Sequence, residues 1–169
     1  MTYSIGVRAV NLAGISEMTV ANVTVRTVPD APEVAATAGD GEVLLSWPAL
    51  QAPENGLANI DRYIVYQDGK RIGQTTNTTF LATGLINGQL HSIDVVAVNY
   101  IGSGPKCTIA ASSGTVPDAP ALKDVNADRR TVTMSWDPPA FDGGMSITSY
   151  EGYWLDPDAG AWAMYGEVL

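Results

Sequence analysis

Few side chains in this sequence have both the type and the spacing that catalysis requires. No Ser-His-Asp set stands in a nucleophile-elbow context, and no cysteine stands beside a histidine. The chain also lacks a glycine-rich loop of the kind that holds phosphate groups. Its 18 acidic residues are scattered, so no two of them stand out as the carboxylate pair of a glycosidase. We therefore expect no catalytic residue, no cofactor and no enzymatic activity.

Two features have only part of what a metal site needs. The segment 156–160, Asp-Pro-Asp-Ala-Gly, begins like a calcium loop but lacks the third acidic position and the later glutamate. His91 is the only histidine, and a lone imidazole without a second histidine or a neighbouring cysteine is a poor metal site. We interpret 156–160 as a polar turn between strands, and we expect no bound metal.

Charge and composition exclude further classes of protein. The chain has 18 acidic and 9 basic residues, a formal net charge of −9, and no cluster of cations interleaved with aromatic residues. Nucleic-acid and anionic-membrane surfaces require such cations. No apolar run approaches the ~18 residues of a membrane span, and residues 1–20 lack the pattern of a signal peptide. We expect no nucleic-acid partner and no membrane insertion.

The sequence repeats itself with an offset of 88 or 89 residues. The related segments are 3–11 and 91–99, 28–32 and 116–120, and 46–48 and 135–137. A single period across three unrelated motifs predicts tandem copies of one module of about 90 residues.

Apolar and polar residues alternate within the repeated segments, which is the pattern of strands with one buried face. No helical stripe lasts three turns, so the sequence predicts an all-β fold. In the middle repeat the predicted strands are 31–37, 42–47, 61–67, 70–75, 79–82, 90–99 and 105–111. Seven such strands indicate a two-sheet sandwich of immunoglobulin type. Cys107 is the only cysteine, so no disulfide pins this sandwich, and we expect the thiol to be buried and inert.

These segments resemble the fibronectin type III domain over essentially the whole chain. The resemblance rests on the tryptophan of the second strand (Trp47, Trp136), the tyrosine opening the third (Tyr63, Tyr150), the run 85–93, the loop 97–104 and the loop 136–144. It implies an immunoglobulin-like β-sandwich in tandem modules.

The resemblance also implies a set of structural core residues: Trp47, Tyr63, His91, Trp136 and Tyr150. His91 departs from the family, because the family has a tyrosine at this corner, which the first repeat keeps as Tyr3. An imidazole can donate or accept a hydrogen bond where a phenol would. We expect His91 to bond to nearby backbone.

Aligning the repeats divides the chain into one complete domain and two partial ones. Residues 29–116 form a complete fibronectin type III domain. Residues 1–28 correspond to the sixth and seventh strands (F and G), and residues 117–169 to the first three strands (A to C) with a fourth (C′) at 162–168. One interpretation is a stretch of a longer array. The other is head-to-tail strand complementation, in which the front of one chain completes the back of another.

Two loops carry apolar side chains flanked by glycine. The first contains Tyr100 and Ile101, and the second contains Phe141 and Met145. Loops at the ends of a rigid sandwich are common binding sites, so these four residues are candidate contacts for a sugar or a protein. The alternative interpretation is that they pack against the neighbouring module.

The linker Val-Pro-Asp-Ala-Pro leaves few free torsions, because each proline fixes its own φ and restrains the residue before it. A linker of this stiffness suits a non-catalytic structural spacer. In its low charge, lack of a disulfide and stiff linkers the chain also resembles arrays of phage tail or capsid appendages and bacterial surface proteins, and this resemblance implies an adhesion role and an extracellular or virion-associated location. The alternatives are an accessory module of a secreted polysaccharide-degrading enzyme and an intracellular muscle-type array. The expected partners are neighbouring fibronectin type III modules or other protein subunits, and a surface polysaccharide.

Overall fold

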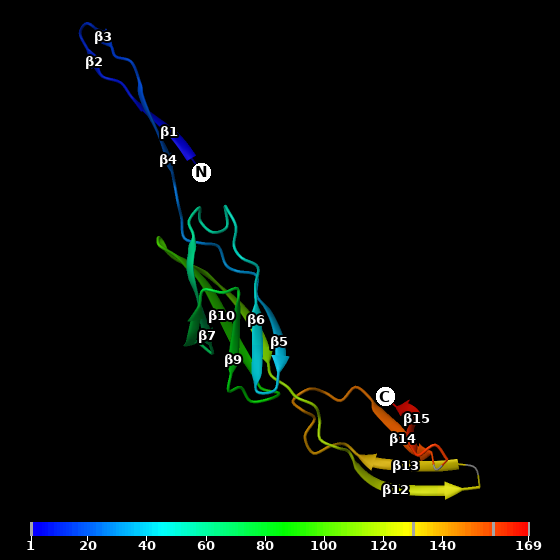
Figure 1. Ribbon diagram of the computed structural model, residues 1–169. Coiled ribbons are helices and arrows are strands. Elements are labelled where there is room, and N and C mark those ends of the chain that lie inside the picture. The colour runs from blue at the N-terminus through cyan, green and yellow to red at the C-terminus, as the bar shows by residue number, and fades with distance from the viewer. Residues whose placement is uncertain (1, 130, 157, 169) are drawn as a thin grey trace. The chain divides into compact units, whose positions relative to one another are not determined.

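The computed structural model describes residues 2–129, 131–156 and 158–168 (Figure 1). All regular secondary structure among these residues is β-strand, which confirms the predicted all-β fold. The strands are β1 (Thr2–Val7), β2 (Val10–Asn11), β3 (Gly14–Ile15), β4 (Thr19–Thr24), β5 (Ala35–Gly39), β6 (Glu42–Ser46), β7 (Ile60–Gln67), β8 (Lys70–Thr75), β9 (Thr79–Thr83), β10 (Leu90–Asn99), β11 (Gly102–Ser112), β12 (Ala121–Asp128), β13 (Thr131–Asp137), β14 (Tyr150–Asp156) and β15 (Ala161–Val168). A helix able to cross a membrane is therefore not found in this part of the chain.

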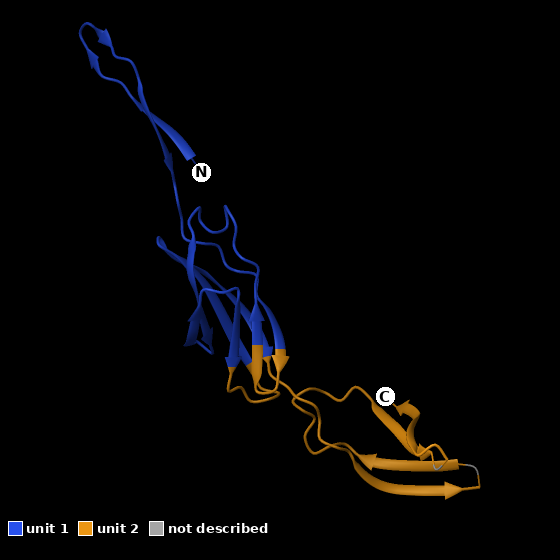
Figure 2. Cartoon of the chain, viewed as in Figure 1, with its two compact units in different colours: residues 1–37, 44–82, 91–111 blue, residues 38–43, 83–90, 112–169 orange. Residues whose placement is uncertain are grey.

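The chain forms two compact units, coloured separately in Figure 2. Unit 1 consists of residues 1–37, 44–82 and 91–111, and unit 2 of residues 38–43, 83–90 and 112–169. The predicted domain limits follow the sequence repeat instead and remain predictions. The two linkers that join the repeats lie inside one unit each, the first in unit 1 and the second in unit 2.

The strands of the middle repeat form two sheets, in the orders β11-β10-β7-β8 and β5-β6-β9. Antiparallel pairing of β10 with β7 places Val95 opposite Val65 and Ala97 opposite Tyr63. The completely buried apolar side chains come from both sheets, because alternation gives each strand one inward face. They are Val43, Leu45, Val65, Ile93, Val95 and Ala97.

Two predictions for the middle repeat were wrong in detail. The first strand begins at Ala35 and not at residue 31, because Pro29 and Pro32 occupy the approach to it and proline cannot donate to a sheet ladder. Both prolines are completely buried. Cys107 lies in β11 as predicted, but its side chain is only half-buried.

The first repeat contributes a long hairpin. β1 pairs with β4, with Tyr3 opposite Val23 and Ile5 opposite Ala21. The short strands β2 and β3 pair at the tip of the same hairpin. Every side chain from residue 2 to residue 28 is exposed. This hairpin therefore has strand pairing but no core of its own.

The third repeat contributes two hairpins, β12–β13 and β14–β15. The rings of Trp136 and Tyr150 lie 5.4 Å apart at 56°. Trp47 and Tyr63 form the same pair in the middle repeat, at 5.0 Å and 59°. Trp47 and Tyr63 are buried, whereas Trp136 and Tyr150 are only half-buried.

Candidate functional site

The loop between β10 and β11 presents Tyr100 and Ile101, which are 61% and 46% exposed. The Tyr100 hydroxyl accepts a hydrogen bond from Nη1 of Arg26 at 2.8 Å, and the Arg26 guanidinium lies 5.8 Å from the centre of the Tyr100 ring. Arg26 belongs to the segment 25–34 between β4 and β5, which contains the Val-Pro-Asp-Ala-Pro run and is called the first linker from here on; the second linker is the segment 113–120 between β11 and β12. Tyr100 therefore contacts the linker, which supports the packing interpretation for this side chain.

Asn99, at the end of β10, holds this loop and the linker together. Its side-chain oxygen accepts hydrogen bonds from the N–H groups of Ile101 (3.0 Å) and Gly102 (3.2 Å). Its side-chain amide donates to the carbonyl of Thr27 (2.8 Å) and to the carbonyl of Asn55 (3.1 Å). Since Asn99 is only 2% exposed, these bonds are shielded from competing water.

The two linkers make the same pair of backbone hydrogen bonds. In the first, the N–H of Thr27 donates to Gly56 (3.0 Å) and the N–H of Asp30 donates to Glu54 (2.8 Å). In the second, Thr115 donates to Gly143 (2.8 Å) and Asp118 donates to Phe141 (3.0 Å). Each linker is thus fastened to the loop after the second strand of the domain that follows it.

Gly56 and Gly143 allow the linker backbone to come this close to the loop without a steric clash. Both are buried and have positive φ, 73° and 80°. A Cβ atom at Gly56 would overlap the carbonyl oxygen of Thr27, and one at Gly143 would overlap that of Thr115. A side chain at either position would strain the backbone and also displace the linker.

The second junction has additional close contacts. Gly144 lies against the backbone of Asn87 and Gly88, in the loop before β10, so that no Cβ fits between them. The Met145 side chain lies beside Gly114, where a Cβ atom would be 2.8 Å from its Cε. Met145, 47% exposed, therefore packs partly on the linker.

Phe141 is 41% exposed and lines an open depression with Pro138, Ile147 and Tyr150. Its backbone carbonyl accepts the linker bond from Asp118. Tyr100 and Phe141 belong to different compact units. Each loop is therefore a separate candidate contact.

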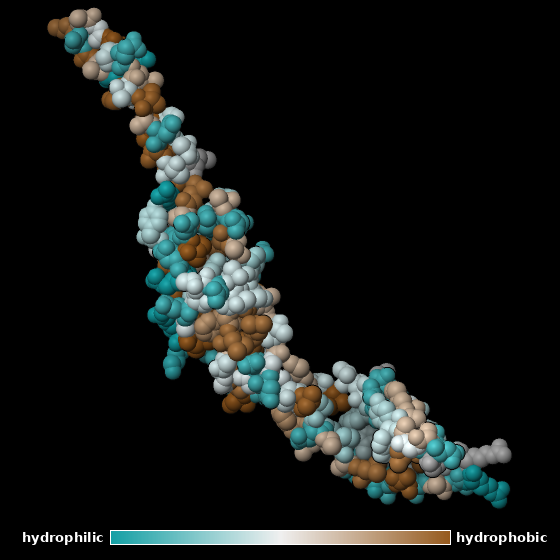
Figure 3. All heavy atoms as spheres, viewed as in Figure 1, coloured by the Kyte–Doolittle hydropathy of each residue, from teal (hydrophilic) through white to brown (hydrophobic). Residues whose placement is uncertain are grey.

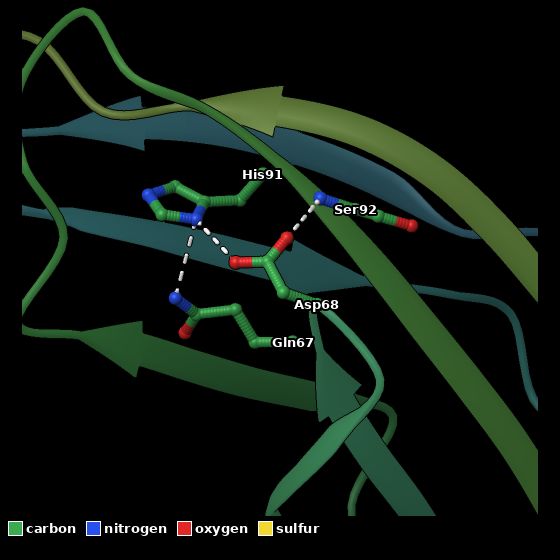
Figure 4. A network of polar contacts seen from close by, with 4 residues as sticks. All are labelled: Gln67, Asp68, His91 and Ser92. Atoms are coloured by element: carbon green, nitrogen blue, oxygen red, sulfur yellow. Dashed lines mark hydrogen bonds and ion pairs between the residues drawn. The ribbon is translucent and has the colours of Figure 1, made fainter.

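His91 has a different partner from the predicted one (Figure 4). It is 7% exposed, and its Nδ1 lies 2.7 Å from Oδ2 of Asp68 and 3.3 Å from Nε2 of Gln67. The other Asp68 oxygen accepts the N–H of Ser92 at 2.9 Å. The bond to His91, followed by the bond from Ser92, lowers the pKa of the Asp68 carboxyl below its ordinary 3.8. The expected bond to backbone is replaced by one to this carboxylate.

A second carboxylate is held between β10 and β11. Asp94 accepts a hydrogen bond from the Thr108 hydroxyl at 2.5 Å and an ion-paired hydrogen bond from Nζ of Lys106 at 2.9 Å. The bond from Thr108 lowers the pKa of Asp94 most, and the bond from Lys106 adds to it. The Asp94 side chain is 11% exposed and Lys106 is 61% exposed, so this pair stabilises the sheet edge and is open to solvent on one side.

In the acidic turn after β14, a carboxylate accepts hydrogen bonds from the backbone of the same turn. Oδ1 of Asp156 accepts the N–H groups of Asp158 (2.9 Å) and Ala159 (3.2 Å). This is the bonding of an Asx turn. Pro157, within the same segment, lies outside the described residues.

Sequence reasoning did not identify Asn99, Gly56 or Gly143 as junction residues. A signal was present, because Asn55-Gly56 and Asp142-Gly143 lie 87 residues apart. An Asn-Gly or Asp-Gly pair that recurs within two residues of the repeat offset, in an otherwise divergent loop, indicates a backbone requirement. The partner, a linker almost 30 residues earlier in the chain, could not be inferred from it.

Two of the curated relatives that this chain resembles lie at a similar distance from it. No protein-family model matches the chain. The Kelch domain-containing protein SSO1033 of Saccharolobus solfataricus is 28% identical over 156 residues, which cover 89% of this chain and 20% of that protein. Exoglucanase B of Cellulomonas fimi is 27% identical over 172 residues, covering 89% of this chain and 16% of that protein. The chain thus spans a fifth or less of the length of these relatives.

Among solved structures, the FN1-FN3 domains of chicken CNTN1 match 97% of this chain and 62% of theirs, with a TM-score of 0.51 and 19% identity. A likeness at this identity concerns the fold. Together with the seven-stranded middle repeat, the Trp–Tyr ring pair in two repeats and the all-β content, it confirms the resemblance stated from the sequence. The chain has the fold of tandem fibronectin type III domains.

Proposed function

We propose that this chain is a non-catalytic spacer in a longer tandem array, in which each linker is fastened to the domain that follows it. The observation that carries the proposal is the pair of backbone hydrogen bonds that recurs at both linkers, from Thr27 and Asp30 and from Thr115 and Asp118. The same bonds at two places in a divergent sequence indicate that the junction itself serves a purpose.

The junction chemistry suits a spacer, because it removes freedom from the linker. Prolines fix their own torsions and restrain their neighbours, and buried hydrogen bonds hold the remaining residues. Pro29, Pro32 and Asn99 are all buried at the first junction. A linker held in this way transmits orientation between domains better than a free chain of the same length.

A more specific role as the accessory region of a secreted polysaccharide-degrading enzyme is supported by the likeness to exoglucanase B, which covers 89% of this chain but only 16% of that protein. This alternative places the protein outside the cell. Its test is the natural polypeptide beyond these residues: a glycoside hydrolase domain there would support it, and a phage structural domain would contradict it. The virion role stays a prediction.

Hydrogen exchange measured by NMR tests the spacer proposal. We expect the amides of Thr27, Asp30, Thr115 and Asp118 to exchange slowly, as those of the strands do, although they lie in linkers. Exchange at the rate of free loop amides would mean that the linkers swing freely, and it would contradict the proposal.

Glycine variants give this measurement a matched control. Gly56→Ala should release the Thr27 and Asp30 amides, and Gly143→Ala those of Thr115 and Asp118. Gly84→Ala is the control, because Gly84 also has positive φ (77°) but has open space where its Cβ would lie. All three substitutions strain the backbone by about 1 kcal/mol, but only the first two should change linker exchange.

A further inference from the structure

The loop between β9 and β10 contains an asparagine followed directly by a glycine, Asn87-Gly88. The side-chain oxygen of Asn87 accepts a hydrogen bond from the N–H of Gly41 at 2.9 Å, and its amide nitrogen donates to Oδ1 of Asp40 at 2.7 Å. Asp40 and Gly41 form the turn between β5 and β6. The Asn87 side chain therefore joins two loops of the middle repeat.

Gly88 connects the same loop to the second junction. Its N–H donates to the carbonyl of Ser113, the first residue of the second linker, at 2.9 Å. Gly144, in the third repeat, lies so close that a Cβ atom there would overlap the backbone nitrogen of Gly88. All these residues belong to unit 2. The peptide bond between Asn87 and Gly88 is thus part of both the side-chain bonding and the junction.

An Asn-Gly pair converts to aspartate without an enzyme. The backbone nitrogen of the glycine attacks Cγ of the asparagine, and glycine offers least obstruction because it has no Cβ. A C–N bond forms, the proton of the attacking nitrogen passes through solvent to the side-chain amide, and ammonia leaves a five-membered succinimide. Water then adds to one of the two ring carbonyls and breaks its bond to nitrogen, which gives an aspartyl or an isoaspartyl residue. Water is the only other reactant, and hydrophilic residues, coloured teal in Figure 3, lie at the surface of both units.

The closed junction holds both reacting groups. The Gly88 nitrogen donates to Ser113, and the Asn87 amide is bonded to Asp40 and Gly41. The attack therefore requires that both leave their partners, and Gly144, which packs on the same nitrogen, must move with them. The rate at Asn87 is then the rate of the free peptide multiplied by the fraction of time that the junction is open.

We propose that Asn87-Gly88 is a modification site, and that its conversion opens the second junction irreversibly. The inference rests on the proposed function, in which this linker is fastened. An aspartate at position 87 has no N–H for Asp40, so two carboxylates meet where a 2.7 Å hydrogen bond was. An isoaspartate also adds a methylene group to the backbone directly before Gly88 and displaces the donor to Ser113. Either product favours the open junction.

The other Asn-Gly pair of the chain, Asn55-Gly56, provides an internal comparison. Gly56 is buried against the first linker, whereas Gly88 is exposed. The Asn55 carbonyl also accepts the amide of the buried Asn99 at 3.1 Å. Because more contacts must break at the first junction, we expect Asn55 to convert more slowly than Asn87 in the folded chain.

Peptide mass spectrometry of the intact chain, kept in mildly alkaline buffer, measures both conversions, since a hydroxyl replaces an amino group. The same incubation in urea gives the rate of the open peptide. We expect Asn87 to convert about tenfold more slowly in the folded chain than in urea, which corresponds to ~1.4 kcal/mol, and still faster than Asn55. Asn87→Gln is the blank. A folded chain that converts Asn87 as fast as urea does, or that converts Asn55 first, would overturn the proposal.

Gly144→Ala tests whether the junction controls the reaction. Its Cβ overlaps Gly88 and its φ is 80°, so the variant should raise the rate at Asn87 about fivefold, equal to ~1 kcal/mol, and leave Asn55 unchanged. Gly160→Ala is the matched control, because Gly160 also lies in the third repeat with positive φ (62°) but has open space around its Cβ position. Equal rates in the two variants would contradict control by the junction.

Asn87→Asp installs one product directly and tests its effect. The amides of Gly88 and Gly114, which donate to Ser113 and Gly39, should exchange with solvent about fivefold faster than in the wild type. Adding Asp40→Asn supplies a donor to the new carboxylate and should restore slow exchange, which a general loss of stability would not allow. Fast exchange already in the wild type would contradict the spacer function itself. Slow exchange in both the wild type and Asn87→Asp would overturn only the present inference.

Discussion

His91 and its carboxylate partner show how single residues are placed in this chain. The alignment with Tyr3 identified His91 as a corner residue, and its burial follows from the apolar alternation of β10. Its partner Asp68 could not be inferred, because Asp68-Gly69 has the sequence of an ordinary hairpin turn and lies 23 residues away. The local alternation of apolar and polar residues predicts which face of a strand a residue occupies. Its contacts across the sheet can be identified only in the folded structure.

The hydrogen bonds of Asp94 predict how the stability of the fold depends on pH in acid. The bonds from Thr108 and Lys106 lower the folded-state pKa below the ordinary 3.8, so the carboxylate stabilises the fold at pH values above 3.8. This contribution is lost as the pH falls through the lowered folded-state value. Asp94→Asn removes it. We expect the variant to be less stable than the wild type at pH 7 and the difference to shrink near pH 2.

Urea unfolding at the two pH values measures this effect. Thr108→Val is the matched control, because it removes the hydroxyl that contributes most to the lowered pKa and keeps the shape of the side chain. It should show a smaller loss with the same pH dependence. A stability difference for Asp94→Asn that is equal at both pH values would contradict the assignment.

At the scale of elements, the alternation of apolar and polar residues predicts the strands well but predicts the segments that lead into them poorly. β6, β7, β8 and β10 lie within a residue of their predicted limits, since each has one buried face. The segment before β5 also looks like a strand by composition, yet Pro29 and Pro32 are buried in a linker that bonds to a loop. A hydrogen bond to a distant loop leaves no periodic signal in the sequence.

Equivalent strands in different repeats should respond differently to the same substitution. Ile93 in β10 is completely buried, and Ile5 at the aligned position of β1 is 59% exposed. Ile93→Ala should lower the free energy of unfolding by about 2–5 kcal/mol, the cost of a cavity in a packed core. Ile5→Ala should change it by less than about 0.5 kcal/mol. Chemical denaturation at low protein concentration checks both, and equal losses would mean that β1 is already covered.

At the scale of the whole molecule, the repeat period predicted the tandem arrangement because three motifs shared one offset. The same alignment predicted partial first and third repeats, and these domain limits stay a prediction. The hydrogen bonding of each linker to the domain that follows it was only partly predictable from the sequence. Prolines indicated a stiff connection, but the loop that each linker bonds to became evident only in three dimensions.

The recurring junction has a consequence for how such arrays grow. At the first junction the linker donors, the carbonyls of Gly56 and Glu54 that accept their hydrogen bonds, and the buried Asn99 all belong to a single period of the sequence. A duplication or deletion of one whole period would therefore add or remove a complete set of these junction residues and leave the other junctions intact. Unequal recombination between repeats could lengthen or shorten the protein in fixed increments, and selection could tune its reach without redesigning any contact.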